Sequence, residues 1–275
     1  MPEHVTRPRR SRRPPYAVCA ALFLVLTGCG ASGTAPAPAP GTAAAPGRGD
    51  GSRAPAPAGT SGARPVAPAR GPAAPTRPRE IRLLGPGIRA AIPADSRQAL
   101  VVTGDSPDSS LATAVLYTRE DSRAGWQPAL GPWPAHNALN GWTDEHRAGD
   151  LRTPIGVYGL TAAGGLLSAP DTAFPYEQNP LFNVSGQGFQ GDSLEGSFDY
   201  VIAIDYNRTP GASPLDPTRP LGEERGGGIW LHVDHGGPTQ GCISLPEDRM
   251  RELLRTLDPA KVPVVVMGDA AALGR

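Results

Sequence analysis

One stretch of the chain predicts a strand followed by a tight turn, and it carries the most reactive side chains: Gly228-Ile229-Trp230-Leu231-His232-Val233-Asp234-His235-Gly236-Gly237-Pro238-Thr239-Gln240-Gly241-Cys242-Ile243-Ser244-Leu245. Side chains alternate along residues 229–233, so the aliphatic ones share one face of the strand, and Trp230 and His232 share the other. Two glycines and a proline follow. They allow the chain to turn back, so that Cys242 meets His232.

The sequence around this stretch is typical of a β-rich domain. Short apolar or alternating runs separated by Gly, Pro and Asp predict strands at Ala99–Thr103, Ala112–Thr118, Ile155–Leu160, Tyr200–Tyr206, Ile229–Val233 and Val262–Met267. One helix is predicted, from Glu247 to Leu257, where apolar residues keep helical spacing and Ser244-Leu245-Pro246-Glu247 matches a capping box. Many strands with one late helix indicate a mainly β fold, a sandwich or closed sheet with one or few helices, over residues 81–270.

The N-terminal part predicts export. Arginines precede a twelve-residue apolar run at Ala17–Gly28, too short to span a bilayer, which is typical of a secretory signal over residues 1–28. Leu26-Thr27-Gly28-Cys29 resembles the bacterial lipobox, so Cys29 is expected to carry lipid. The alternative is an ordinary signal cut nearby. Residues 29–80 are rich in Ala, Pro and Gly and predict a disordered linker between anchor and domain.

Charge and cysteine content limit the range of possible functions further. The chain has 26 basic and 26 acidic residues, so its charge gives no argument for binding nucleic acid, which would need a concentrated basic face. Export and a lipid anchor predict a membrane-attached protein on the outer face of the cell membrane or in the cell wall. Cys19 leaves with the signal and Cys29 takes lipid, so Cys242 remains as the single thiol of the mature domain. A lone thiol in that compartment is either buried and inert or kept to react.

Cys242 and His232 have the chemistry of a nucleophile and its base. The thiolate is the nucleophile, and an adjacent imidazole can take the thiol proton and later protonate a leaving amine. Gly241 leaves space beside the sulfur, and backbone N–H groups there can face an oxyanion. Thr239 and Ser244 are further candidates for this oxyanion or substrate-binding role, although Ser244 also serves as the predicted helix cap.

Two other site chemistries compete with this interpretation. His232, His235 and Cys242 offer three zinc ligands, but the two histidines lie three apart on a strand and a fourth ligand is not evident. A serine hydrolase would need a Gly-x-Ser-x-Gly elbow, which Ser185 does not fit. The Cys–His pair without a metal is therefore favoured.

Two motifs carry a resemblance to the YkuD-type catalytic domain of L,D-transpeptidases. His232 followed by Thr239-Gln240-Gly241-Cys242 resembles the family's strand His and its Ser/Thr-x-Gly-Cys. Upstream, the run from Gly149 to Tyr158 resembles the family's Gly-Asp-x-x-Thr-Pro-x-Gly-x-Tyr/Phe pattern. The chain departs by having Gln240 where His is commonest and by a shorter loop, which suggests an ErfK/YbiS-like subgroup.

The resemblance implies a reaction without metal or cofactor on peptidoglycan stem peptides. Cys242 would attack the diamino-acid carbonyl of a tetrapeptide stem, expel the terminal D-Ala and form a thioester. An amine of a neighbouring stem would resolve it into a 3→3 cross-link, with His232 as the base and His235 in reserve. Two alternatives remain open: water as acceptor, making an L,D-carboxypeptidase, or a non-catalytic wall-binding lipoprotein.

Overall fold

The computed structural model describes residues 80–275. The signal peptide predicted at residues 1–28, the lipid attachment at Cys29 and the linker predicted at 29–80, apart from its last residue, lie outside this part. Within it, the expected mainly β fold is confirmed.

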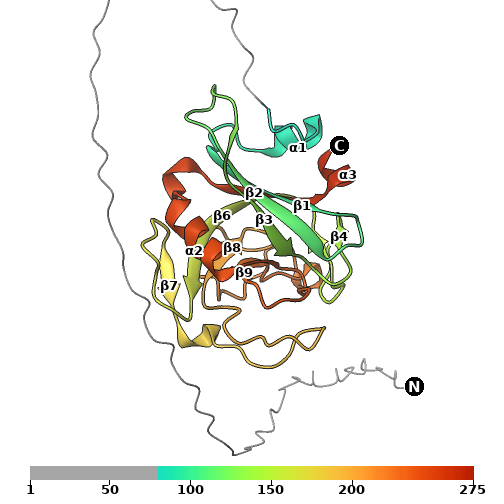
Figure 1. The fold of residues 1–275 in the computed structure, drawn as a ribbon, viewed down its shortest axis with the longest axis vertical. Helices are drawn as coiled ribbons and strands as arrows, with labels where there is room; N and C mark the ends of the chain where they lie inside the picture. Colours follow the sequence, from blue (N-terminus) through green and yellow to red (C-terminus); the bar gives the residue numbers. More distant parts are fainter. Residues whose placement is uncertain (1–79) are drawn as a thin grey trace, which may run out of the picture. The chain divides into compact units, whose positions relative to one another are not determined.

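Nine strands of the described part form one sheet, in the order β11-β1-β2-β3-β10-β9-β8-β6-β7. Their bounds are β1 Gln98–Gly104, β2 Leu111–Thr118, β3 Gln127–His136, β6 Gly156–Gly165, β7 Tyr176–Gln178, β8 Val201–Ile204, β9 Trp230–Val233, β10 Ile243–Leu245 and β11 Val264–Asp269. The long strand β6 pairs with β11 near its start and with β8 further along, so the sheet closes on itself like a barrel (Figure 1). A separate pair joins β4 (Trp142–Thr143) to β5 (Thr153–Pro154).

The helices are few and cover the ends and one side of this sheet. Helix α2 (Glu247–Thr256) confirms the predicted helix, and α1 (Pro86–Ala91) and α3 (Ala270–Leu273) lie next to each other (Figure 1). Short 3-10 turns occur at Pro180–Phe182, Glu223–Arg225 and Pro259–Lys261. The predicted capping box is wrong: Pro246 is the N-cap of α2 and no side chain caps this end. Ser244 lies in strand β10 instead.

All six predicted strands have a counterpart, but β3 and the shorter strands β4, β5, β7 and β10 were not predicted. The ten-residue strand β3 contains Pro128, Pro132 and Pro134, and proline within a run argues against a strand because it donates no backbone hydrogen bond. Strand β3 tolerates them with an irregular pairing to β2 and only one paired position, Ser244 with His136, on β10.

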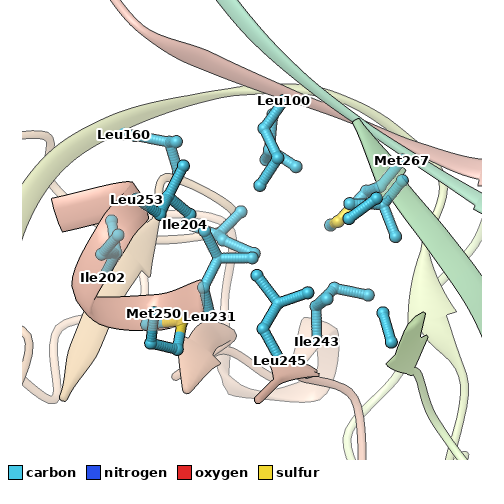
Figure 2. Packing of buried hydrophobic residues seen from close by; sticks show 14 of the residues in the cluster. Leu100, Leu160, Ile202, Ile204, Leu231, Ile243, Leu245, Met250, Leu253 and Met267 are labelled. Atoms are coloured by element: carbon cyan, nitrogen blue, oxygen red, sulfur yellow. The ribbon is translucent and has the colours of Figure 1, made fainter. Parts of the chain in front are cut away.

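The main core fills the interior of the closed sheet. Alternate residues of β1 and β11, such as Leu100 and Met267, point into it, while their neighbours build a smaller apolar cluster on the other face with Leu273 of α3. Figure 2 shows Leu231 of β9 and Met250 of α2 among the side chains that meet in this interior. The aliphatic residues of β9 and β10 are thereby held inward, and the intervening side chains must face the other way.

Candidate active site

A cavity of about 580 Å³ brings together most of the residues predicted from the sequence. Cys242, His232, Gly241 and Thr239 all line it. They converge because β9 and β10 run parallel, with Ile243 opposite Leu231 in the core. By alternation, Cys242, directly before Ile243, and His232, directly after Leu231, lie on the opposite face, and both line the cavity.

Cys242 lies directly before β10 and is partly exposed. The backbone N–H of Trp230 donates to its sulfur at 3.4 Å, and the thiol faces the carbonyl oxygen of Gly228 at 3.7 Å. Burial raises the pKa of the Cys242 thiol to about 11, and the hydrogen bond from Trp230 opposes this only in part. The thiol is therefore protonated near neutral pH.

His232 is buried on β9, and its orientation is set by the backbone of the next residue. Nδ1 lies 2.8 Å from the carbonyl oxygen of Val233, which can only accept, so Nδ1 carries the proton and Nε2 keeps a free lone pair. The edge of Phe198 meets the ring, with centroids 5.3 Å apart. Burial lowers the pKa of His232 to about 4, although the Val233 hydrogen bond acts in the opposite direction.

The two groups form a neutral pair. No hydrogen bond joins the sulfur to the imidazole among residues 80–275, and their pKa values keep the proton on sulfur and off Nε2 around neutrality. Bonds between catalytic groups are often long or poorly aligned before substrate binds. A neutral thiol beside a neutral imidazole suits a mechanism in which the proton leaves sulfur as the sulfur attacks.

Thr239 and Gly241 shape the turn that presents the sulfur. The Thr239 hydroxyl donates to the carbonyl of Cys242 at 2.7 Å and so closes the turn between them. A Cβ at Gly241 would come 2.9 Å from Cδ1 of Ile229, so any larger residue beside Cys242 would require that side chain to move. The oxyanion role expected for this turn stays a prediction.

The structure does not bring Ser244 into the cavity. It is fully buried, and its hydroxyl donates to Oδ1 of Asp234 at 2.6 Å. The same carboxylate contacts Nδ1 of His136 on β3 at 2.8 Å. Burial alone would raise the pKa of Asp234, but the bonds from His136 and Ser244 outweigh it and lower the pKa to about 2. This cluster fastens the start of the 234–241 loop to β3 and β10.

His235, the reserve base, stacks on His232 with centroids 5.7 Å apart and planes 7° apart. Its Nδ1 contacts the carboxylate of Asp192, and it also lines the cavity. The competing zinc site gains no support from this packing. Within residues 80–275, no group of three His, Cys, Asp or Glu side chains is placed to hold a metal ion.

Several cavity residues were missed in the sequence. The most notable is His146, buried on the loop between β4 and β5, with Phe198 and the Gly226–Gly228 strip as further parts of the wall. The sequence signal that could have identified His146 is its spacing from Asp150, four residues away within a polar loop.

Among the residues that the structure describes, no helix is long and apolar enough to cross a membrane.

Comparison with known proteins gives the family. The model of the L,D-transpeptidase catalytic domain (YkuD) matches residues 108–266, more than half of the chain. A solved structure of Mycobacterium tuberculosis L,D-transpeptidase 1 aligns at 12% identity and a TM-score of 0.29, covering 62% of this chain and 61% of that one. No curated protein matches. On the strength of the family match, this chain belongs to the L,D-transpeptidase catalytic domain family (YkuD).

Proposed function

We propose that this protein is a cysteine-dependent L,D-transpeptidase that acts on peptidoglycan stem peptides through a thioester at Cys242. One observation carries the proposal: in a chain of this family, His232 of β9 and Cys242, directly before the parallel strand β10, line one cavity, with Nε2 of His232 unprotonated. The lack of charged side chains of Asp, Glu, Lys or Arg in the described lining of that cavity makes proton transfer between neutral groups the favoured route.

The reaction begins with the neutral pair. The sulfur of Cys242 forms a bond to the diamino-acid carbonyl carbon while the thiol proton passes to Nε2 of His232. The carbon–nitrogen bond to the terminal D-Ala then breaks, and the leaving amine takes that proton. An amine of a second stem attacks the thioester, forms the 3→3 amide bond and returns the sulfur as a thiol.

The setting of this activity is also part of the proposal. Export, lipid attachment at Cys29 and an Ala/Pro/Gly-rich linker would hold the domain beyond the membrane, where stem peptides lie. The short loop and Gln240 support placing the chain in an ErfK/YbiS-like subgroup. Metabolic labelling with an alkyne fatty acid tests the anchor: label on the wild type but not on Cys29→Ser supports it, and equal label on both contradicts it.

Acylation by a carbapenem tests the nucleophile, since these drugs acylate the family. Intact-mass measurement should show one adduct on the wild type, none on Cys242→Ala and at least about a hundredfold slower adduct formation on His232→Gln. A wild type without adduct would support the non-catalytic alternative. Slow alkylation would not, because the raised thiol pKa makes even a catalytic Cys242 slow toward alkylating agents.

The identity of the acyl acceptor needs a separate measurement. Muropeptides incubated with the protein should yield 3→3 dimers together with released D-Ala. Release of D-Ala without any dimer, in the presence of a competent amine, would replace the transferase by the L,D-carboxypeptidase.

A further inference from the structure

The cavity holds a second imidazole that the reaction above leaves without a role. His146 is only 4% exposed, and its ring lies beside the glycine that precedes the nucleophile: a Cβ at Gly241 would stand 3.7 Å from Cε1 of His146. His232 and His235 stack on each other. His146 therefore reaches the wall beside Gly241 from a different segment than that stacked pair.

The loop around His146 is built to hold this ring. Both carboxylate oxygens of Asp150 accept backbone N–H groups, from Arg147 at 2.8 Å and from Arg152 at 2.9 Å. Nδ1 of His146 lies 3.0 Å from Oδ1 of Asp150, although the alignment falls short of a hydrogen bond, and Nδ1 has no other partner among the described residues. The nearby carboxylate favours a proton on Nδ1, which leaves a lone pair on Nε2.

Nε2 of His146 points to a place that is kept free of side chains. A Cβ at Gly226 would come within 2.8 Å of Nε2, and Gly226 has a φ of +65°, which favours glycine. The ring is therefore a buried polar group with its accepting nitrogen aimed at the glycine-lined wall. No residue of the described part hydrogen-bonds that nitrogen, so a substrate group is its natural partner.

The charge of the cavity indicates which substrate group this is. In the part of the chain that is described, the lining contains no Asp, Glu, Lys or Arg, so its titratable groups are Cys242 and the three imidazoles. A substrate carboxylate would face a lone pair on Nε2 and the carboxylate of Asp150 behind the ring. An ammonium group, by contrast, can donate its proton to Nε2.

We propose that His146, oriented by Asp150, is the base that deprotonates the ammonium group of the acyl acceptor; this rests on the proposed function. The acceptor R–NH₃⁺ gives one proton to Nε2 of His146, which passes it to solvent. The resulting R–NH₂ attacks the thioester carbon. Its second proton moves through His232 to the sulfur as the carbon–sulfur bond breaks, leaving an amide and the Cys242 thiol.

Deprotonation of an ammonium group is required for transfer to an amine but not for hydrolysis, in which water is the acceptor. A primary amine of this kind has an ordinary pKa of about 10.4, so only about four molecules in ten thousand are free base at pH 7. Formation of the thioester and its hydrolysis use His232 and require no second base. His146 therefore governs the partition between transfer and hydrolysis.

The test compares that partition in the wild type and in His146→Gln. With a tetrapeptide donor and a primary-amine acceptor at pH 7, the variant should lose at least about tenfold in the ratio of dimer to hydrolysis product. Its rate of acyl-enzyme formation should stay within about twofold, which also shows that it is folded. As the pH approaches 10, where roughly a third of the amine is free base, the deficit should shrink.

The pH dependence of the ratio must be distinguished from titration of the groups around the His146 ring. Asp150 faces Nδ1, the ring of Tyr206 meets His146 edge-on at 5.3 Å, and Cys242 shares the cavity. Burial raises the pKa of Tyr206 and Cys242, so neither titrates between pH 7 and about 9.5. Recovery over that interval would therefore come from the acceptor amine.

Matched variants complete the design. His136→Gln removes an imidazole that contacts a carboxylate outside the cavity and should leave the ratio unchanged. Asp150→Asn should lower the ratio in the same direction and provides the test if His146→Gln fails to fold.

Two results would overturn the inference. If His146→Gln slows formation of the acyl-enzyme itself, the ring acts on the donor and not on the acceptor. If the ratio of dimer to hydrolysis product is unchanged at pH 7, the ring acts on neither the donor nor the acceptor. Failure of the proposed function can be distinguished from failure of this inference. A wild type that forms no acyl-enzyme contradicts both the proposed function and the role of His146. An acyl-enzyme that gives only hydrolysis in excess amine contradicts the role of His146 alone.

Discussion

The Nδ1 atom of His232 lies 2.8 Å from the carbonyl oxygen of Val233, the next residue along β9. This contact assigns the proton to Nδ1 and leaves Nε2 with a free lone pair. The hydrogen bond orients the ring and by itself raises its pKa, but burial outweighs this and lowers the pKa of His232 to about 4. The pair with Cys242 is therefore neutral in the absence of substrate.

Alkylation of Cys242 should report this neutral state. A thiol of pKa about 11 has roughly a hundredfold less thiolate near pH 7.5 than a free cysteine, so iodoacetamide should modify Cys242 about that much more slowly. The rate should rise about tenfold per pH unit from 7.5 to 9.5. Mass spectrometry of the Cys242 peptide measures it. Rapid modification independent of pH would instead reveal a thiolate–imidazolium pair.

His232 should make the protein less stable in weak acid. Its folded pKa of about 4 is below the unfolded value of about 6.5, so the unfolded state takes up the proton first as the pH falls. The free energy of unfolding should drop by up to about 3 kcal/mol between pH 6.5 and 4 through this group, and no further below. Urea denaturation at pH 4.5 and 7 should show a smaller pH effect in His232→Gln. An equal effect in both proteins would refute the buried neutral imidazole.

Thr239→Val should loosen the turn that presents the sulfur. The variant loses the 2.7 Å hydrogen bond to the Cys242 carbonyl, at a cost of about 1 kcal/mol in unfolding free energy. We expect acylation of Cys242 by a carbapenem to slow about three- to tenfold, and Thr239→Ser to retain the wild-type rate. If Cys242 is acylated as fast in Thr239→Val as in the wild type, the turn does not depend on this hydrogen bond.

Ser244→Ala separates structural support from substrate binding. Removing the hydroxyl takes a donor from Asp234, which should raise the pKa of that carboxylate from about 2 and cost about 1 to 2 kcal/mol of stability at pH 7. Because Ser244 does not line the cavity, acylation should stay within about threefold of the wild-type rate. A folded variant that no longer acylates would return Ser244 to the substrate-binding residues.

The parts of the fold that the sequence predicts well are those with strong local patterns. The strands β1, β2 and β11 and the helix α2 show their periodicity in consecutive residues, and the structure contains them at nearly the predicted bounds. Strand β3 was missed because its prolines contradict local strand preference, and pairing with β2 outweighs that preference. The capping box failed for the converse reason: Ser244 is needed by Asp234 in the tertiary structure.

What the sequence by itself determined is that the imidazole of His232 and the thiol of Cys242 share one face of the domain. Alternation along residues 229–233 forced His232 away from the core, and the glycine-rich turn returned Cys242 to the same face, since both effects act over a few residues. Only the tertiary structure decided the surroundings that tune these groups. The contact of Asp234 with His136 spans 98 residues, and His146 reaches Gly241 from a distant loop. Burial, which sets the pKa values of both Cys242 and His232, depends on how closely such remote segments pack, and local pattern carries no measure of it.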